Sequence, residues 1–199
     1  MDENNEKYQQ MLSTSLELFA KFGYKKTTVE DVATSINMTK GNLYFYVKNK
    51  KDLYEKTIDF ALNQWKDFVN DAVNKEKDVV SKFRILAQKS IEYIENNRTV
   101  QTILINDPSI FTLSSTEDRF YNTNVSAMNI IKKILEQGIE EKMFFPVDVE
   151  HITEYLFSVY IMFLIKSYVK SDNSSLKKMF SEGLELTIRG LLLKGTSNN

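Results

Sequence analysis

Aromatic and basic residues are concentrated in TKGNLYFYVKNKKDL (residues 39–53), where three consecutive aromatic side chains lie among four lysines. Successive side chains of a helix point about 100° apart, so Tyr44, Phe45 and Tyr46 cannot all face one core. At least one ring is therefore exposed. Phenol hydroxyls can donate to phosphates and ring edges can meet thymine methyl groups in a major groove, while Lys and Asn reach base edges. The alternative is that Phe45 and Tyr46 pack against another helix.

The lysines belong to a basic segment of an otherwise acidic chain. The whole chain has a formal net charge of −1, but residues 21–51 contain seven lysines and two acidic residues, a net charge of +5, which leaves −6 on the remainder. A basic segment attached to an acidic body is expected where only one part of a protein meets phosphates. A solvated lysine-rich surface is the other interpretation.

Two short helices joined by a tight turn are predicted to present this surface. Thr27 and Glu30 have capping-box spacing, Asn37 tolerates the left-handed conformation that ends a helix, and Thr39 is a good N-cap for the next one over 39–47. The apolar residues that face inward are spaced by three and four: Val29, Val32, Ala33 and Ile36, then Leu43 and Val47. This is the helix-turn-helix pattern.

Longer helices are expected on both sides of this motif. The periodicity that begins at Tyr8 stops at Gly23, which tolerates positive φ. After the motif, Asn49 can cap a helix over 50–73. Lys50 in its first turn opposes the helix dipole, so we expect a phosphate nearby.

The stretch after Gly23, TTVEDVATSINMTKGNLYFYVKNKKDLY, resembles the N-terminal DNA-binding region of the tetracycline-repressor (TetR) family of bacterial transcriptional regulators, over about residues 8 to 55. The resemblance implies phosphate contacts at Thr39, Tyr44 and Lys50, and a further backbone contact at Tyr46. It implies that Lys40, Gly41 and Asn42 face bases. Family members often carry phenylalanine where this chain has Val47, a difference that concerns core packing. The predicted DNA-binding set is Thr28, Thr39, Lys40, Gly41, Asn42, Tyr44, Phe45, Tyr46 and Lys50.

The fold class predicted is all-α, with an N-terminal three-helix DNA-binding domain (1–49) and a larger helical effector-binding and dimerisation domain (50–199) joined by the helix over 50–73. Only two prolines and six glycines interrupt the chain, which suits long helices with short connections. Further helices are predicted near 78–96, 99–106, 118–142, 148–170 and 175–194.

The last two of these helices are expected to form a homodimer interface. Residues 155–165 are apolar nearly all round, and a broad apolar stripe follows on the next helix, more than a monomer of this size should bury. The resemblance implies a four-helix dimer interface through 148–170 and 175–194. Two-fold symmetry would then place two recognition helices about 34 Å apart on a palindromic double-stranded DNA operator.

A pocket for a small-molecule effector is implied by the resemblance, with binding expected to tilt the helix over 50–73. Many rings and few inward charges favour an apolar or aromatic ligand with a small polar end, although most aromatic side chains at helical spacing simply belong to a core. The segment 107–118 is a candidate entrance. The predicted lining residues are Trp65, Phe68, Tyr93, Phe111, Phe120, Tyr121, Met128, Tyr155, Tyr160 and Phe163.

Several other classes of function are disfavoured. The chain has no cysteine, and its one histidine, His151, lies between Asp148 and Glu154 without a second strong metal ligand. Phosphate-loop, nucleophile-elbow and dinucleotide motifs do not occur, so we expect no enzyme, cofactor or metal site. The acidic start and the short apolar runs indicate no signal peptide and no membrane partner, hence a cytoplasmic protein.

Three interpretations therefore remain open. The first is a ligand-responsive dimeric repressor. The second is a DNA-binding architectural or cell-cycle protein with the same fold and no effector. The third is a helical lipid-binding protein or enzyme with a vestigial N-terminal region, which the basic segment and the exposed Tyr44 argue against.

Overall fold

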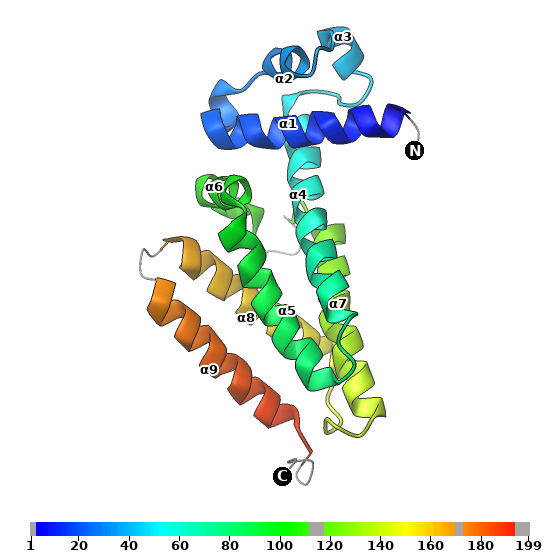
Figure 1. Ribbon diagram of the computed structural model, residues 1–199, viewed down its shortest axis with the longest axis vertical. Coiled ribbons are helices and arrows are strands. Elements are labelled where there is room, and N and C mark those ends of the chain that lie inside the picture. The colour runs from blue at the N-terminus through cyan, green and yellow to red at the C-terminus, as the bar shows by residue number, and fades with distance from the viewer. Residues whose placement is uncertain (1–2, 112–117, 170–172, 194–199) are drawn as a thin grey trace. The chain divides into compact units, whose positions relative to one another are not determined.

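The regular structure of the residues described below is helical (Figure 1). The computed structural model describes residues 3–111, 118–169 and 173–193. These ranges contain a short 3₁₀ turn, Pro108–Ile110, and the helices α1 (Glu3–Lys26), α2 (Val29–Ser35), α3 (Lys40–Leu43), α4 (Lys50–Val73), α5 (Val79–Asn96), α6 (Arg98–Asn106), α7 (Tyr121–Glu140), α8 (Val149–Val169) and α9 (Asn173–Leu191). The all-α prediction is confirmed, and the predicted helices occur with most ends displaced by only a few residues. The predicted ends of the last two helices, residues 170 and 194, lie outside the described ranges.

The chain divides into two compact units. The first comprises Met1–Gln64 and Ile94–Asp107, and the second comprises Trp65–Tyr93 and Pro108–Asn199. Helix α4 supplies its first part to the first unit and its last part to the second. The predicted domain boundary between residues 49 and 50 stays a prediction.

The core of the first unit is built from the predicted apolar stripes. Leu43 and Val47 are buried, as are the inward positions of α2. Helix α1 contributes Leu12, Leu16 and Phe19 to the same core and also packs along α6. Burial of these side chains supplies the main driving force that holds the short helices α2 and α3 in place, because helices of this length are not stable alone.

The chain enters α2 one residue later than predicted. The cap is Thr28, whose Oγ1 accepts from the Asp31 N–H at 3.1 Å, while the Asp31 carboxylate accepts from the Thr28 N–H at 2.8 Å. Thr27 is buried and its hydroxyl is directed to the Gly23 carbonyl at 3.0 Å, so it is not available as a cap. The predicted box of Thr27 and Glu30 is therefore wrong, and Glu30 has no capping role.

The recognition segment, residues 39–47, is only partly α-helical. Thr39 caps α3 as predicted, accepting from the Asn42 N–H at 3.2 Å, and Asn37 has the expected left-handed φ of 55°. The α-helix, however, ends at Leu43. Tyr46 N–H then bonds the Leu43 carbonyl at 2.9 Å, a three-residue step that tightens the turn.

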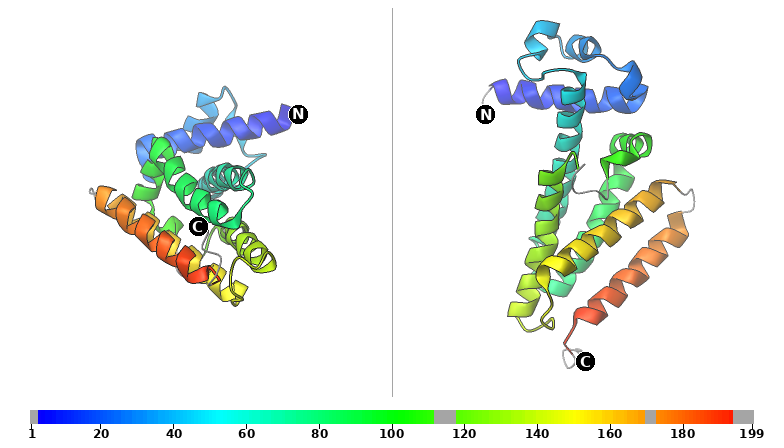
Figure 2. Two further views of the ribbon diagram at one scale, coloured as in Figure 1. Left: turned by 60° about the horizontal axis from the view of Figure 1, so that its bottom comes forward. Right: turned by 180° about the vertical axis from the view of Figure 1, so that it is seen from behind.

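Helices α5, α7, α8 and α9 supply most of the second unit. Helix α7 packs on α8, and α8 lies beside α9 (Figures 1 and 2). The end of α9 is tied to the segment after α7, because Phe145 N–H donates to the Leu191 carbonyl at 2.9 Å. Arg84 of α5 adds a two-point ion pair to Glu185 of α9, with its closer N to O distance at 2.7 Å.

Gly138 allows the close packing after α7. A Cβ atom built on Gly138 would overlap the buried ring of Phe144. The same glycine carbonyl accepts the Phe144 N–H at 2.9 Å, so the chain folds back tightly over this position. Residue 138 must therefore lack a side chain for Phe144 to reach the core.

Candidate DNA-binding surface

Most of the recognition segment is accessible to a partner. Lys40, Gly41 and Asn42 are exposed, Tyr44 is 43% exposed, and Phe45 is 87% exposed. Two of the three consecutive rings thus face outward, as helix geometry requires of at least one. Exposure of this many large side chains leaves the segment with contact surface that the described chain does not cover.

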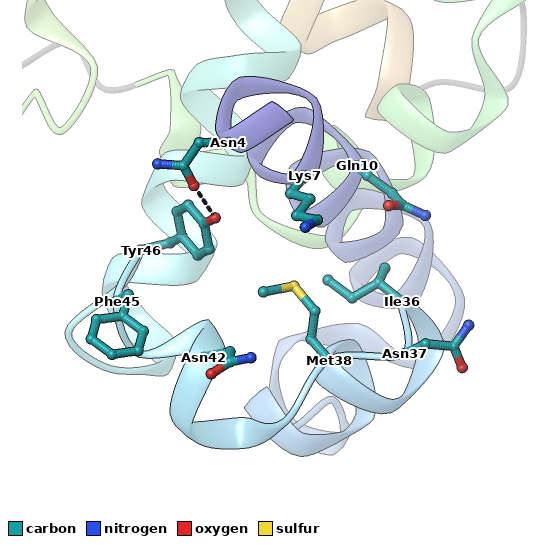
Figure 3. Close-up of a pocket in the computed structure, with 9 residues that line it drawn as sticks. All are labelled: Asn4, Lys7, Gln10, Ile36, Asn37, Met38, Asn42, Phe45 and Tyr46. Atoms are coloured by element: carbon teal, nitrogen blue, oxygen red, sulfur yellow. Dashed lines mark hydrogen bonds between the residues drawn. The ribbon is translucent and has the colours of Figure 1, made fainter. Parts of the chain in front are cut away.

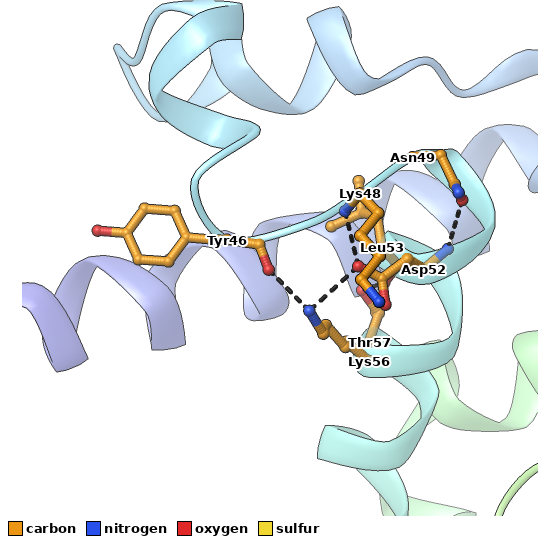
Figure 4. A network of polar contacts seen from close by, with 7 residues as sticks. All are labelled: Tyr46, Lys48, Asn49, Asp52, Leu53, Lys56 and Thr57. Atoms are coloured by element: carbon orange, nitrogen blue, oxygen red, sulfur yellow. Dashed lines mark hydrogen bonds and ion pairs between the residues drawn. The ribbon is translucent and has the colours of Figure 1, made fainter.

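Tyr46 is half-buried and ties the recognition segment to two other helices. Its hydroxyl donates to the Asn4 side-chain oxygen (Figure 3). Its ring stacks on Tyr8 with centroids 5.8 Å apart. Its carbonyl accepts from Lys56 Nζ at 2.7 Å (Figure 4). Tyr46 therefore has a structural role on α1 and α4, in agreement with the packing alternative. Its predicted contact with DNA backbone stays a prediction.

An open groove lies between the start of α1 and the recognition segment. It has a volume of about 800 Å³. Lys7 and Gln10 of α1 face Met38 and Ile36 across it (Figure 3). Asn42 and Phe45 of the recognition segment also line the groove. The groove is therefore continuous with the exposed part of that segment. Sequence reasoning did not connect the first ten residues with this surface.

The start of α4 holds Lys50 beside the end of α1. Lys50 Nζ donates to the Lys25 carbonyl at 3.1 Å and lies 4.6 Å from the centroid of the Tyr24 ring. These contacts are weak enough to be exchanged for a phosphate, because a carbonyl and an aromatic face are both uncharged. In both of these contacts the Lys50 ammonium, in the first turn of α4, meets a neutral group. Its charge is not paired by these contacts and can bind a phosphate.

The helix start itself is well capped. The Asp52 N–H donates to Asn49 Oδ1 at 2.9 Å, and the Asp52 carboxylate accepts from Lys48 N–H at 2.7 Å (Figure 4). Partial burial raises the pKa of Asp52, but the Lys48 N–H and the Lys56 ammonium outweigh it and bring that pKa below its ordinary value. The carboxylate therefore stays charged and fixes the turn that precedes α4.

Lys40 is paired within the chain. Its ammonium contacts the Glu30 carboxylate, and both side chains are about half-exposed. The hydrogen bond between the two groups lowers the pKa of Glu30 and raises that of Lys40, so both remain charged near neutral pH. Lys40 is held at the start of α3 by a neighbour that sequence reasoning assigned to a cap.

The two threonines of the predicted set combine capping with exposure. Thr28 and Thr39 each accept a backbone N–H through the side-chain oxygen, and both are exposed. A hydroxyl that accepts in this way still carries its own O–H, which can donate to a phosphate. Gly41 is equally open, since a Cβ built there would meet no atom nearer than Thr39 Oγ1 at 3.9 Å.

Five of the ten predicted effector-binding residues form one aromatic cluster in the second unit. The Trp65 ring lies 6.1 Å from Tyr93, 6.3 Å from Phe111 and 6.3 Å from Tyr160, measured between centroids. Phe68 joins through Tyr93 at 5.3 Å. We call these five residues the Trp65 cluster.

Polar groups accompany the Trp65 cluster. Trp65 Nε1 donates to the Ser90 carbonyl at 3.1 Å, and the Ser90 hydroxyl donates to the Leu86 carbonyl at 2.6 Å. Removal from water raises the pKa values of Tyr160 and Tyr93, and the Ser90 side chain offsets part of that rise for Tyr160. Both phenols are therefore neutral at physiological pH.

The other predicted effector residues lie in different surroundings. Phe163 pairs with Phe180 at 5.1 Å, Phe120 is buried at the start of α7 and Met128 is half-buried. Tyr121 and Tyr155 are more than half-exposed. Residues 112–117, most of the predicted entrance, lie outside the described residues.

Helices α8 and α9 carry exposed apolar side chains. Tyr155, Met162, Met179 and Leu186 are all exposed, and Leu186 reaches 74%. Aliphatic and aromatic groups gathered on two neighbouring helices mark an interaction surface when no part of the described chain covers them.

Other chemistry finds little support among the described residues. His151 Nδ1 lies 2.8 Å from Asp148, and both groups are exposed at the start of α8. Within residues 3–111, 118–169 and 173–193 no cluster of three potential metal ligands occurs. In the same ranges no helix combines the length and apolar character needed to cross a bilayer.

Sequence comparison assigns a family to the N-terminal part of the chain. The model of bacterial regulatory proteins of the tetR family matches residues 11–57. The uncharacterized HTH-type transcriptional regulator YhgD of Bacillus subtilis (strain 168) is 25% identical over 95% of this chain and 96% of its own. The IcaR negative regulator of the icaADBC biofilm operon from Staphylococcus epidermidis is 32% identical over 30% of this chain and 32% of its own.

Solved structures share the fold over nearly the whole chain. A TetR-family regulator from Pectobacterium atrosepticum has a TM-score of 0.75 at 16% identity, covering 98% of this chain and 99% of that one. The regulator FadR from Bacillus subtilis, solved in complex with stearoyl-CoA, has a TM-score of 0.75 at 17% identity, covering 92% and 99%. At these identities the likeness concerns the fold alone.

Proposed function

We propose that this chain, which belongs to the tetracycline-repressor (TetR) family of bacterial transcriptional regulators, is a dimeric repressor that binds a palindromic operator and releases it when a small molecule binds. The observation that carries the proposal is the recognition segment, whose Lys40, Asn42, Tyr44 and Phe45 are exposed together at one helix-turn-helix. Such a surface is costly in water and complementary to a major groove.

The proposed contacts are of two kinds. Some position the protein on the DNA backbone, and others read the base sequence. Thr28, Thr39, Tyr44 and Lys50 are assigned to phosphates, because hydroxyl and ammonium donors fix a protein on the duplex without reading its sequence. Lys40 and Asn42 are assigned to base edges, and Gly41 to close approach of the duplex. The exposed ring of Phe45 would add apolar contact, for which thymine methyl groups are suited.

Dimerisation is proposed through α8 and α9. Their exposed apolar side chains support this assignment, since pairing two copies about a two-fold axis would cover them. The same axis would relate two recognition segments, and half-sites about 34 Å apart would match one turn of DNA.

The effector is proposed to bind around the Trp65 cluster. Its rings offer apolar and stacking contacts, and the Tyr160 hydroxyl and Ser90 offer a few polar ones. This lining suits an apolar or aromatic molecule with a small polar end. The stearoyl-CoA complex of FadR supports only the apolar part of this assignment, because its acyl chain is apolar while its CoA part is larger and more polar than the end proposed here.

An effector-independent DNA-binding protein is the second candidate. The rings of the Trp65 cluster contact one another at ordinary packing distances, and the Trp65 N–H already has a protein partner. These contacts equally describe a filled core. In either case we propose a cytoplasmic protein that works on DNA without catalysis, cofactor or membrane.

Selection of bound duplexes from a random DNA pool tests the DNA-binding part of the proposal. Native mass spectrometry is first used to select wild-type protein that carries no ligand. This protein should enrich a palindrome at near-physiological salt. Tyr44→Ala should bind every duplex more weakly and select the same palindrome with a lower yield, because Tyr44 is exposed and assigned to a phosphate. A pool that stays random with wild type contradicts sequence-specific binding.

A thermal-shift series decides between the two candidates. A ligand that binds only the native state must raise the melting temperature. Saturated acyl-CoA thioesters and aromatic acids are suitable probes, and Trp65→Phe should reduce the shift. A probe that both raises the melting temperature and releases the selected palindrome supports the repressor, whereas binding to DNA unaffected by every probe supports the effector-independent protein.

A further inference from the structure

We propose that Glu30 is a base-reading residue that acts as a pair with Lys40, so that each half-site contains a cytosine read by the Glu30 carboxylate next to a guanine read by Lys40. The inference rests on the proposed function and extends it to a residue outside the predicted set. It names the chemical group recognised, the exocyclic amine of cytosine in the major groove.

The two side chains are brought together by different helices. Glu30 is the second residue of α2, and Lys40 is the first residue of α3. Their charged ends are in contact and both remain about half-exposed. Lys40 Nζ also lies 6.0 Å from the centroid of Tyr44, so the pair is adjacent to the exposed rings of the recognition segment.

Local stability gives little reason for Glu30. The cap of α2 is completed by Asp31, whose carboxylate accepts the Thr28 N–H. Glu30 and Asp31 both place negative charge in the first turn, where it complements the helix dipole, and Asp31 would still do so without Glu30. An ion pair as exposed as that of Glu30 and Lys40 contributes little to the stability of a fold.

Non-specific attraction to DNA gives no reason for it either. A carboxylate on this surface repels phosphates, and it neutralises a lysine that would otherwise add to the attraction. The arrangement weakens binding to DNA in general, so a benefit must come from particular base pairs.

Base edges in the major groove supply that benefit. Cytosine presents the N4 amino group, for which a carboxylate is the complementary acceptor, and guanine presents O6 and N7, for which an ammonium is the complementary donor. A neighbouring acceptor and donor on the protein therefore match a cytosine beside a guanine, either in one pair or in adjacent pairs. A base that presents only acceptors at this position leaves the Glu30 carboxylate without a donor.

The test is the random-pool selection repeated with Glu30→Gln and with Glu17→Gln. The first variant keeps the shape of the side chain and removes its charge. The second makes the same change in net charge at an exposed position of α1. Matched circular dichroism spectra and melting temperatures show that each variant is folded.

The inference predicts that wild type enriches cytosine at one position of each half-site. With Glu30→Gln that preference should fall by about tenfold or more, the discrimination that one good side-chain contact to a base provides, with adenine as the expected replacement because glutamine pairs with adenine. The rest of the motif should be unchanged, and Glu17→Gln should select the wild-type motif.

Two other results overturn the inference in distinguishable ways. If Glu30→Gln selects the wild-type motif, with affinity unchanged or uniformly raised, Glu30 only repels phosphate and the proposed repressor function stands. If ligand-free wild type selects no motif, the proposed function fails and the base-reading role fails with it.

Discussion

At the residue scale, Lys50 and Asn42 represent the two kinds of contact expected with DNA. Lys50→Ala should weaken binding to every duplex and make the salt dependence shallower by about one unit, because one phosphate contact is lost. Asn42→Ala should mainly relax base preference. Fluorescence anisotropy with the selected palindrome and a scrambled duplex, over a salt series, measures both effects. If each variant loses the same affinity for the palindrome as for the scrambled duplex, the assignment of the two residues to different contacts, Lys50 to a phosphate and Asn42 to a base, is contradicted.

Gly41 gives a prediction in which stability and binding diverge. Gly41→Ala should leave the melting temperature unchanged or raise it slightly, because a Cβ there meets no atom closer than 3.9 Å and alanine is the better helix former. The same variant should bind the palindrome more weakly if the duplex closely approaches α3. Thermal denaturation and anisotropy test the two halves. Unchanged binding would mean that Gly41 is not at the interface.

His151 provides a pH-dependent prediction. The hydrogen bond and charge of Asp148 raise the pKa of His151 above 6.5. The stabilisation is therefore fully present below pH 6.5 and disappears as the pH rises through the raised pKa. The melting temperature of wild type should exceed that of His151→Gln at about pH 5.5, and the difference should shrink by about pH 8.5. A difference independent of pH would contradict the ion pair. Because both groups are exposed, the effect should be small.

Single residues also show how far a sequence can be interpreted. Spacing predicted the buried positions of α2 and α3, because burial follows helical periodicity. It misplaced the cap by one residue, since Thr27 and Thr28 both suit a cap and only packing decides which is buried. The partners of Tyr46 and Glu30 were missed because Asn4 and Lys40 reach them from other helices. No local pattern contains such contacts.

At the element scale, Gly138 determines how α7 ends. Gly138→Ala should lower the stability of the protein by about 1–3 kcal/mol, because its Cβ would overlap the Phe144 ring. Gly183→Ala is the matched control. Gly183 also lies within a helix, but a Cβ there would meet nothing within 4 Å, so the change should be neutral or stabilising. Chemical denaturation compares the two variants.

A double variant tests whether the loss of stability comes from steric overlap with the Phe144 ring. If the ring of Phe144 is the obstacle, the double variant Gly138→Ala with Phe144→Leu should cost less than the sum of the two single changes, because the smaller side chain leaves room. Strict additivity would mean that Gly138 acts through the backbone and not through Phe144.

Element boundaries were predicted well where long apolar stripes define them. The expected α4 over 50–73 coincides with the helix observed, since periodicity and the Asn49 cap agree. The recognition helix was predicted over 39–47, yet α3 ends at Leu43. Lys56 holds the tight turn after it through the carbonyl of Tyr46. A contact to a backbone carbonyl leaves no pattern in the sequence, because every residue carries that group.

At the scale of the whole molecule, dimerisation through α9 can be tested by one charge. Leu186→Lys should weaken self-association by at least about tenfold, because it places an unpaired cation in the proposed apolar interface. Ile105→Lys, another exposed aliphatic position but on α6, is the control and should remain a dimer. Sedimentation over a concentration series measures both. A dimer undisturbed by Leu186→Lys would place the interface elsewhere.

The oligomeric assembly and the effector are the features that one sequence predicts least well. An apolar surface such as that of α8 and α9 indicates that a partner covers it. The residue pattern does not say how two copies of the chain would be oriented in a dimer. The Trp65 cluster likewise gathers five residues that spacing alone could not distinguish from Tyr121 and Tyr155, because rings at helical intervals are common to cores and to pockets.

The central claim is that two copies of this chain read one palindrome. Sedimentation of the ligand-free protein with the selected duplex, beside a duplex in which one half-site is scrambled, tests it most directly. The account predicts two protomers on the intact palindrome and a large loss of affinity when either half is scrambled. One protomer bound with equal affinity to both duplexes would contradict it.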